Sequence, residues 1–549
     1  MNMIGLIWRT VRHLKIRQIL YQLVHRLRGR VRLRLPKTVP KIYFQIMPDA
    51  DKPVAWQDGV FTFLNQSVCF PLRVDWNYAL YGKLWTYQLN YFDWLNQPGL
   101  SPHTGLKLIY DFISQISTLR DGLEPYPTSL RIINWVQFLG YHQLHDDLIN
   151  QHLFVQAQVL NRRLEYHLAG NHLLENGFAL LIGALYFRNE CWFRKANRLI
   201  RTELTSQILT DGGHNERSPM YHQILLDRLL TVLLTLQHDI WHPDPSLILF
   251  LSQKAVSMLN WLVTITFQNG DIPMVNDSAF GIAPTTAQLA RKAKQVLRLT
   301  KHSAQPDEAS KRVAETSGYR LFRQNRYELF VDAGPVGPDH QPGHAHADTF
   351  SFVLHVDNHP VLVDSGTSTY QPGPRRNWER STAAHNTVEV AGSDSSEVWA
   401  GFRVGRRARV TVMTDTPTTL LARHDGYRYL GIIHERGWLV EPGNICITDR
   451  LLNARGETIS GRGKDGIARF YFHPAIQVKV VGHVVIAGPV QVSFASVTKW
   501  KIAVINYAMA EGFNQLQPGT CLEVAFTSRL ETTLTLLDES ALPDLLFRA

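Results

Sequence analysis

The sequence predicts an α+β multidomain protein, with a helical N-terminal domain followed by an antiparallel β-sandwich. Between residues 42 and 300, apolar side chains recur at three- and four-residue steps, as in Leu225, Leu229 and Leu233, which is the spacing of an amphipathic helix. Residues 301–317 are polar, and beyond them the apolar period changes to two, the spacing of strands. We therefore expect a helical domain at 42–300, a linker at 301–317 and a β domain at 318–549.

The first 41 residues form a separate basic segment, predicted to be a tail or a helix. They contain eleven Lys and Arg residues and no acid, and the other 508 residues contain 46 basic and 47 acidic residues. The formal net charge of +10 therefore belongs to this tail, and the body is close to neutral. Ile4, Ile7, Trp8 and Val11 share one helical stripe. Either the tail makes peripheral contact with an anionic membrane surface, or it is a solvated arm or a helix docked on the body.

Within 42–300, paired helices with short turns suggest an α/α toroid or a solenoid. Asp211-Gly212-Gly213 and Asn269-Gly270-Asp271 are clear helix stops. No fixed-period repeat supports a known repeat family. The expected helices are Leu106–Leu119, Ser129–Leu144, Leu148–Leu168, Leu173–Phe187, Trp192–Leu209, Tyr221–His238 and Pro245–Phe267.

Within 318–549, several segments rich in Val, Ile, Thr and Phe predict strands without intervening helices, hence an antiparallel sandwich. Asp357-Asn358-His359 is a plausible hairpin turn between two of them. The expected strands are Tyr327–Asp332, Thr349–Val356, Pro360–Asp364, Ala408–Thr414, Gly437–Glu441, Ile445–Leu451, Val478–Ile486 and Leu522–Thr527.

Composition excludes several classes of protein. The near-neutral body argues against a nucleic-acid enzyme, which spreads basic charge over its working face. The four cysteines are far apart and form no CxxC, which excludes a Cys-based zinc knuckle and a disulfide scaffold. No apolar run approaches the roughly 20 residues of a membrane span, and no cleavable signal peptide is apparent.

The densest group of chemically versatile residues is Gly343-His344-Ala345-His346-Ala347-Asp348. Asp364 follows 18 residues after His346, and His385 follows 21 residues after Asp364. His346, Asp364 and His385 make a two-histidine, one-carboxylate set, which suits Zn²⁺. They could equally be ordinary polar residues at strand ends.

Two stretches stand out in the helical domain. Gly170–Gly177 contains Asn171 and His172 at a helix start, where an Asn also acts as a cap. Asp211–His222 places five polar residues between two glycines and an apolar helix that starts near Tyr221, which indicates the lining of a cleft. The third stretch, Asn276-Asp277-Ser278, either closes the cleft or simply caps a helix, and the cap is the favoured interpretation. Arg380 either binds an acidic substrate or pairs internally.

These motifs together resemble the heparinase II/III-like polysaccharide lyases, which include oligoalginate lyases. The resemblance rests on GNHLLENG, DGGHNERSPMYH, GHAHAD, VLVDSGT and RSTAAHNTVEV, in that order. It implies an incomplete α/α toroid followed by an antiparallel β-sandwich, with the active site between them. It also implies that this bacterial family's reaction, β-elimination at a uronic acid, applies to this chain.

The resemblance implies a role for individual residues. Asn171 and His172 would neutralise the uronate carboxylate, and Tyr221 and His344 would share the base and acid roles. His346, Asp364 and His385 would hold a structural Zn²⁺. The remaining candidates for substrate binding or support are Asn176, Glu216, Arg217 and Arg380.

The resulting hypothesis is a lyase that acts on an acidic polysaccharide or exopolysaccharide and leaves an unsaturated uronate end. Because the body is near neutral, we expect a carboxylate-only polymer rather than a densely sulfated one. One alternative is a non-catalytic exopolysaccharide-binding or assembly protein. Another is a zinc-dependent glycan hydrolase. The sequence features leave a cytoplasmic or membrane-associated location open, and the resemblance adds the periplasm.

Overall fold

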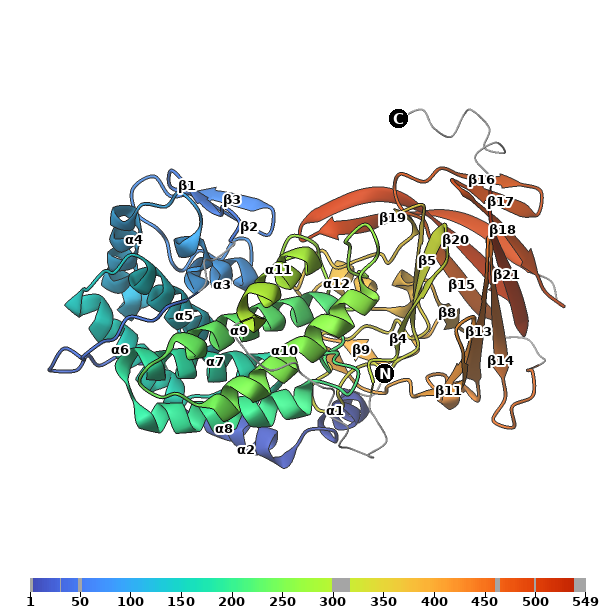
Figure 1. Ribbon diagram of the computed structural model, residues 1–549. Coiled ribbons are helices and arrows are strands. Elements are labelled where there is room, and N and C mark those ends of the chain that lie inside the picture. Colours follow the sequence, from blue (N-terminus) through green and yellow to red (C-terminus); the bar gives the residue numbers. More distant parts are fainter. Residues whose placement is uncertain are drawn as a thin grey trace.

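The computed structural model describes residues 3–29, 31–47, 52–298, 316–459, 465–497 and 500–537. It has two domains side by side, one of helices and one of antiparallel strands, with the N-terminal helices lying along their junction (Figure 1). The α+β class and its order along the chain are therefore confirmed. Most of the expected linker, 301–315, lies outside the described residues.

The helical domain is built from packed helices. Side-chain caps start several of them, such as Ser218, whose Oγ accepts from the Tyr221 amide. Its helices are α3 (Lys83–Tyr91), α4 (Pro102–Gln115), α5 (Pro125–Tyr141), α6 (Asp147–Arg162), α7 (Gly170–Phe187), α8 (Glu190–Gln207), α9 (Pro219–His238), α10 (Pro245–Ile265) and α11 (Thr286–Leu297). Helices α5, α7 and α9 are buried over most of their length, whereas α4, α8 and α11 bury one apolar face. Helices α3 and α11 were not among the helices expected from the sequence.

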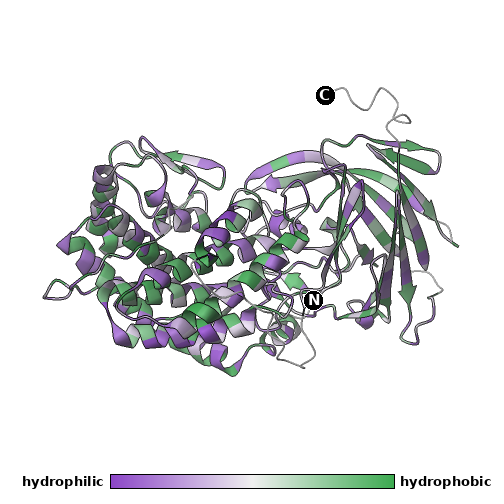
Figure 2. Ribbon diagram, viewed as in Figure 1, coloured by the Kyte–Doolittle hydropathy of each residue, from purple (hydrophilic) through white to green (hydrophobic). Residues whose placement is uncertain are grey.

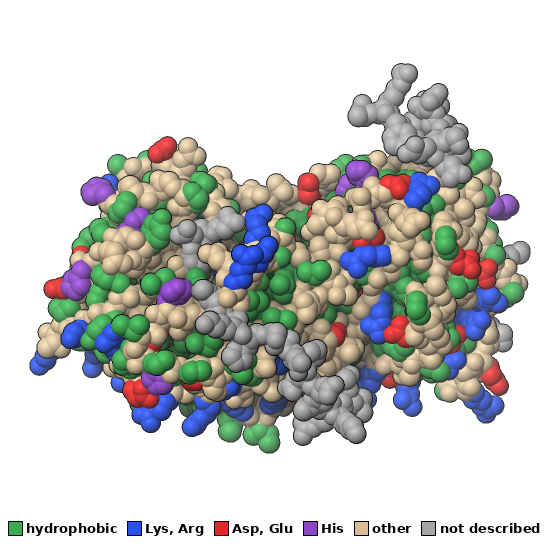
Figure 3. Space-filling model, in the orientation of Figure 1, with side chains coloured by type: hydrophobic (Ala, Val, Ile, Leu, Met, Phe, Trp, Pro, Cys, Tyr) green, Lys and Arg blue, Asp and Glu red, His purple; other side chains and the backbone are tan. Residues whose placement is uncertain are grey.

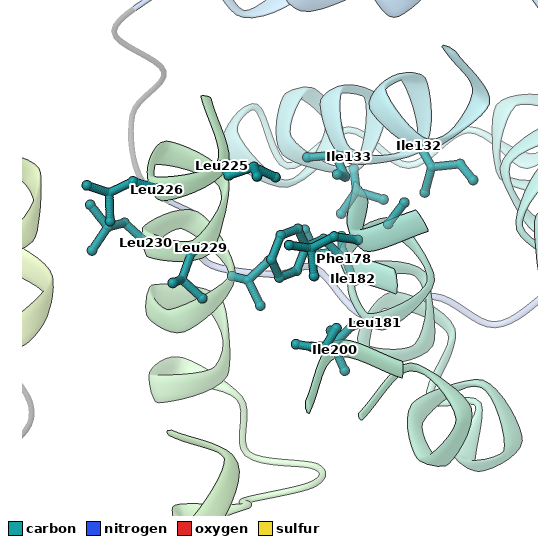
Figure 4. Packing of buried hydrophobic residues seen from close by; sticks show 14 of the residues in the cluster. Ile132, Ile133, Phe178, Leu181, Ile182, Ile200, Leu225, Leu226, Leu229 and Leu230 are labelled. Atoms are coloured by element: carbon teal, nitrogen blue, oxygen red, sulfur yellow. The ribbon is translucent and has the colours of Figure 1, made fainter. Parts of the chain in front are cut away.

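Helix α7 is the centre of this domain, because it is buried on all sides. Phe178 and Ile182 of α7 pack against Ile132 of α5, Ile200 of α8 and Leu229 of α9, all fully buried (Figure 4). Each such side chain contributes about 1.5–3 kcal/mol by leaving water. This packing fixes the start of α7, where the Asn171 and His172 candidates lie.

A three-stranded sheet precedes the helices and was not expected from the sequence. It consists of β1 (Trp56–Gln57), β2 (Val60–Phe63) and β3 (Gln66–Cys69), in the order β1-β2-β3. Its two turns contain Asp58-Gly59 and Leu64-Asn65, all with positive φ. An Asp-Gly pair between apolar segments is a strong hairpin signal, so the sequence carried evidence for this sheet.

The β domain is a sandwich of antiparallel sheets, most of whose buried apolar residues form one core cluster. Hydrophobic and hydrophilic residues alternate along many of its strands (Figure 2). One layer is the eight-stranded sheet β11-β12-β13-β14-β21-β18-β17-β16. The other combines β19-β20-β15-β8 and β4-β5-β6-β7, which a bridge between Leu362 and Phe472 connects. Every expected strand overlaps an observed strand, but Val478–Ile486, expected as one strand, is the hairpin of β16 and β17.

The bounds of these elements are as follows. The strands are β4 (Tyr319–Arg323), β5 (Tyr327–Asp332), β6 (Phe352–Val356), β7 (His359–Leu362), β8 (Val388–Val390), β9 (Val398–Trp399), β10 (Arg403–Val404), β11 (Val410–Asp415), β12 (Thr419–His424), β13 (Ile433–Glu441), β14 (Asn444–Leu452), β15 (Gly466–Tyr471), β16 (Val478–Val481), β17 (Val484–Ala487), β18 (Val490–Ala495), β19 (Lys501–Gly512), β20 (Gln515–Phe526) and β21 (Arg529–Leu536). A short helix, α12 (Pro374–Glu379), lies between β7 and β8.

Among the described residues, α10 is long and apolar enough by composition to cross a membrane. The sequence expectation that no segment approaches this length was therefore too strict. Leu251, Ala255 and Leu262 of α10 are fully buried in the core of the helical domain, and α10 packs against α9 and α11. This packing accounts for part of its apolar character, because Leu249 and Val263 of the same helix are exposed.

The basic tail forms two helices, α1 (Met3–Val11) and α2 (Ile16–Leu27), which dock on the body at the junction of the domains. Arg9 Nε and Nη2 donate to Glu397 of the β domain at 2.7 and 2.6 Å. Gln18 Nε2 donates to the carbonyl of His340 at 3.1 Å, and the Arg17 guanidinium lies 3.6 Å from the Tyr166 ring centroid in the helical domain. The tail is therefore docked rather than free in solvent.

Candidate functional site

A cavity of about 1030 Å³ lies between the two domains and is closed along one side by α1 and α2. His172 and Tyr221 line it from the helical domain, and His344 and Tyr370 line it from the β domain. The N-terminal helices contribute Thr10, Val11, Leu14, Gln18, Gln22 and Arg26. A cavity of this size at a domain junction is a typical ligand site.

Tyr221 and His344 lie side by side in this cavity although they come from different domains. Their ring centroids are 3.9 Å apart and the rings are stacked. Tyr221 is placed at the first turn of α9 by the Ser218 cap, and its hydroxyl lies 3.3 Å from the Tyr370 hydroxyl. Burial raises the pKa of the Tyr221 phenol, so the phenol is protonated at neutral pH and can donate a proton.

His344 is oriented by Asp277, a fully buried carboxylate on the loop between α10 and α11. His344 Nδ1 lies 2.9 Å from Asp277 Oδ2. Because an ionised carboxylate only accepts hydrogen bonds, Nδ1 is the ring nitrogen that donates to Asp277. The Arg376 guanidinium donates to both oxygens of Asp277, at 2.5 and 2.7 Å. Burial alone would raise the pKa of Asp277, but Arg376 and the two histidines hold it well below its usual value.

Asn171 and His172 occupy the first turn of α7, where the helix dipole favours an anion, and the backbone N–H of Asn171 already donates to Glu216 Oε1 at 2.9 Å. The Asn171 side chain is buried, its Nδ2 has no hydrogen-bond partner among the described residues, and Asn171 itself does not line the cavity. His172 reaches the cavity and lies over Tyr126, with ring centroids 4.3 Å apart. Burial would lower the pKa of His172, but Glu165, 3.4 Å from its Nδ1, outweighs this and raises it.

Glu216 connects the two halves of the site. Its Oε1 accepts from the Asn171 amide at 2.9 Å, and its Oε2 lies 3.6 Å from His344 Nε2. Gly170 has φ +57°, and a Cβ there would lie 2.1 Å from Glu216 Oε1. The glycine is therefore required for this close approach, and Glu216 supports the site rather than lining the cavity.

Asn176 also supports the site from behind. Its Nδ2 donates to Glu165 Oε2 at 3.1 Å, and its Oδ1 accepts from the Glu165 amide at 2.9 Å. Glu165 is the carboxylate beside His172. Asn176 therefore positions His172 through Glu165 and lies outside the cavity wall.

Arg217 and Arg380 were expected to offer local positive charge to a uronate, and the structure places both elsewhere. Arg217 is buried and donates to the carbonyls of Ser317, Asn215 and Thr316. Arg380 is buried and donates to the Ala345 carbonyl through Nε and Nη2, at 3.2 and 2.9 Å. Burial, together with the charge of Arg376, lowers the pKa of Arg380 to about 9. Both residues hold loops of the site and neither lines the cavity.

The expected metal ligands come together only in part. His346 Nε2 lies 2.9 Å from Asp277 Oδ1, and His385 Nδ1 lies 2.7 Å from Asp364 Oδ2. The other ring nitrogens, His346 Nδ1 and His385 Nε2, are buried without hydrogen-bond partners in the described chain, and the rings are 5.3 Å apart. Asp364 orients His385 instead of pointing between the two rings, and Asp348 Oδ2 is also without a partner.

Within the described ranges, no three His, Cys, Asp or Glu side chains are already arranged to hold a metal ion. The donor set nevertheless fits zinc chemically, because one imidazole nitrogen of His346, one of His385 and a carboxylate oxygen of Asp348 are buried without hydrogen-bond partners in the described chain. A carboxylate on the far nitrogen of a histidine ligand is the usual way its tautomer is fixed.

Three side chains of the site were missed from the sequence: Asp277, Arg376 and Tyr370. Asn276-Asp277-Ser278 was interpreted as a helix cap, and this is corrected by the contacts of Asp277 with His344, His346 and Arg376. The only signal was a carboxylate in a polar triplet after a Pro turn. Arg376, four residues before the chosen Arg380, carried no distinguishing signal.

Comparison with known proteins agrees with this architecture. Residues 128–304 match the model described as "Heparinase II/III N-terminus", and residues 306–534 match "Heparinase II/III-like, C-terminal". The chain belongs to the heparinase II/III-like family.

Among curated proteins, a heparin-sulfate lyase of Pedobacter heparinus is 24% identical over 64% of this chain and 54% of its own length. One of Bacteroides stercoris is 23% identical over 41% of this chain and 36% of its own. The chain thus matches about half or less of the length of these relatives. The crystal structure of heparinase III superposes with a TM-score of 0.68 at 16% identity, over 86% of this chain and 82% of that one. It has the same fold.

Proposed function

We propose that this protein is a polysaccharide lyase that cleaves a glycosidic bond next to a uronic acid by β-elimination. The observation that carries the proposal is the meeting of Tyr221 and His344, from two domains, in a cavity that also receives His172. The names of the curated heparin-sulfate lyases support the same reaction class. A tyrosine, two histidines and an unpaired amide provide each group that an elimination needs.

The reaction requires charge stabilisation at the carboxylate before the proton is removed. The C5–H bond breaks, its electrons form the C4–C5 double bond, and the C4–O4 bond breaks as O4 takes a proton. Asn171 Nδ2, the positively charged form of His172 and the start of α7 would stabilise the enolate-like carboxylate. Tyr221 and His344 would supply the base and the acid, their order depending on the epimer.

The charge of the cavity supports a uronate polymer with few or no sulfate groups. Six Lys and Arg side chains line it, and four of them are ion-paired. Lys52 pairs with Asp93, Lys83 with Asp121 and Glu124, Arg228 with Glu175, and Arg407 with Asp339. A densely sulfated chain rewards unpaired cations along its whole length. Product analysis with alginate, an unsulfated uronate glycosaminoglycan and heparan sulfate distinguishes these substrates.

The test of the reaction is Tyr221→Phe, with product measured by the ultraviolet absorbance of the new double bond. We expect turnover to fall by about 10²–10⁴-fold, with glycan binding retained. Tyr186→Phe is the control, because Tyr186 is also buried and its hydroxyl bonds to Asn150 away from the cavity. Unchanged turnover in Tyr221→Phe would remove Tyr221 from the mechanism. Absence of unsaturated product from the wild type on every acidic glycan would refute the lyase.

Zn²⁺ is proposed as a structural ion held by His346, His385 and a nearby carboxylate, Asp364 being the ligand expected from the sequence. Its role would be to fix the loop that carries His344. No step of the elimination consumes water, so a metal-activated hydroxide is not required. The two unsatisfied imidazole nitrogens support this proposal.

A further inference from the structure

The N-terminal helical pair, residues 3–27, is docked with its apolar residues facing outward. Only Leu6 and Gln18 of the pair are buried, and the contacts with the body are largely polar. An amphipathic helix on a protein surface normally buries its apolar stripe against the core. Here the stripe is left without a protein partner in the described chain.

Exposed large hydrophobic side chains are more frequent on this helical pair than on the rest of the described surface. Of the 34 large hydrophobic side chains exposed among the described residues, 11 lie between Met3 and Leu27. They are spaced to form one stripe on each helix, and comprise Met3, Ile4, Ile7, Trp8, Val11, Ile16, Ile19, Leu20, Leu23, Val24 and Leu27. A contiguous apolar patch on an otherwise polar protein marks a contact surface.

Positive charge surrounds this stripe. Arg12, Lys15, Arg26 and Arg28 are exposed on or beside the two helices, and no acidic residue occurs before residue 42. Figure 3 shows hydrophobic and basic side chains together along the lower edge of the molecule, where Figure 1 places α2. The patch therefore combines apolar insertion with attraction for an anionic surface.

The positive charge and the apolar surface of the patch together favour one kind of binding partner. Two copies of this chain meeting through the patch would bring two basic tails together, which like-charge repulsion opposes. An anionic bilayer offers complementary charge and an apolar layer at the same time. Lipid-facing helices of this kind lie in the plane of the interface with Trp and Leu inserted and Lys and Arg at the headgroups.

We propose that the helical pair 3–27 is a peripheral membrane-binding surface for bilayers that contain anionic lipid. The opposite side of the same helices lines the cavity through Leu14, Gln18 and Gln22, and Val11 and Arg26, at the border of the patch, reach the cavity as well. Membrane binding would therefore hold one wall of the cavity at the bilayer surface, whichever glycan the cavity accepts.

The test is flotation of the full-length protein with vesicles of phosphatidylcholine with or without phosphatidylglycerol. We expect the wild type to float with the anionic vesicles and to be released progressively by salt. The variant Ile4→Ser/Trp8→Ser/Leu20→Ser/Leu23→Ser removes the apolar stripe at exposed positions outside the cavity wall. Its partition coefficient should fall at least about tenfold, with an unchanged melting temperature.

The matched control is Leu72→Ser/Leu80→Ser/Ile240→Ser/Val497→Ser, four apolar residues elsewhere on the surface that are at least as exposed as those of the stripe. It should float like the wild type. Equal binding by the two quadruple variants, or no binding of the wild type to anionic vesicles, would overturn the proposal. A dimer in gel filtration that the stripe variant dissociates, without flotation of the wild type, would assign the patch to contacts between copies instead.

Discussion

Asp277→Asn tests whether the buried carboxylate network serves catalysis or only stability. Asp277 receives hydrogen bonds from Arg376 Nη1 and Nη2 at 2.5 and 2.7 Å, and lies 2.9 Å from both His344 Nδ1 and His346 Nε2. The substitution keeps the size but removes the charge, so it leaves the buried Arg376 guanidinium without its counterion. Breaking such a buried pair costs about 3–5 kcal/mol of the free energy of unfolding.

A second, kinetic effect should be specific to this position. An amide at residue 277 would no longer fix the proton on His344 Nδ1, and the wrong tautomer of a catalytic histidine costs up to about 10⁴-fold in turnover. We expect a loss of about 10²–10⁴-fold, measured as initial rates of double-bond absorbance. Rates are compared at a temperature where the variant remains folded.

Asp449→Asn is the matched control within the same chain. Asp449 is equally buried, accepts from Arg436 at 2.7 and 2.9 Å and lies 2.7 Å from His434 Nε2. It belongs to the core of the β domain and not to the cavity. Both variants should have a lower melting temperature. At a temperature where both remain folded, only Asp277→Asn should lose turnover. Equal losses of turnover in the two variants would refute an orienting role for Asp277.

The remaining predictions concern the carboxylate end of the site and the metal. Asn171→Ala should lower kcat/KM by about 10²–10³-fold, and a smaller loss would mean that its unpaired amide does not contact the transition state. The folded-state pKa of His172 is raised, so activity that requires its charged form is lost as pH rises through that pKa. Glu165→Gln removes the carboxylate that raises this pKa, so the loss of activity at high pH should begin at a lower pH. A pH–activity profile that does not move would contradict a charged His172. A zinc chelator should lower the melting temperature, and zinc should restore it; no change, with no zinc found by metal analysis, would exclude the proposed ion.

The elements that sequence predicted well have strong local signals. The period of Leu225, Leu229 and Leu233 gave α9, and Tyr327–Asp332 coincides with β5. The first sheet was missed because its strands are only two to four residues long, even though Asp58-Gly59 marks its first turn. Periodicity measured over longer windows averages such short strands away.

The site was predicted where its residues stand in dense local motifs, and missed where contacts join distant segments. Asn171, His172, Tyr221 and His344 were chosen from such motifs, and the last three line one cavity. Asp277 meets His344 across 67 residues and Arg376 across 99, and nothing local indicates these contacts. Arg217 was expected to face a substrate because a charge in a loop favours solvent, but carbonyl groups from residues 316 and 317 satisfy it in the interior.

The reacting groups are divided between the two domains, so the turnover rate depends on how the domains are positioned relative to each other. Tyr221 and Asp277 belong to the helical domain, whereas His344, Tyr370 and Arg376 belong to the β domain. A small rocking of one body against the other would separate the rings, now 3.9 Å apart between centroids, without unfolding either body. Mild denaturant should therefore stop catalysis before it melts either domain. Two halves produced as separate polypeptides should regain activity only when they reassemble.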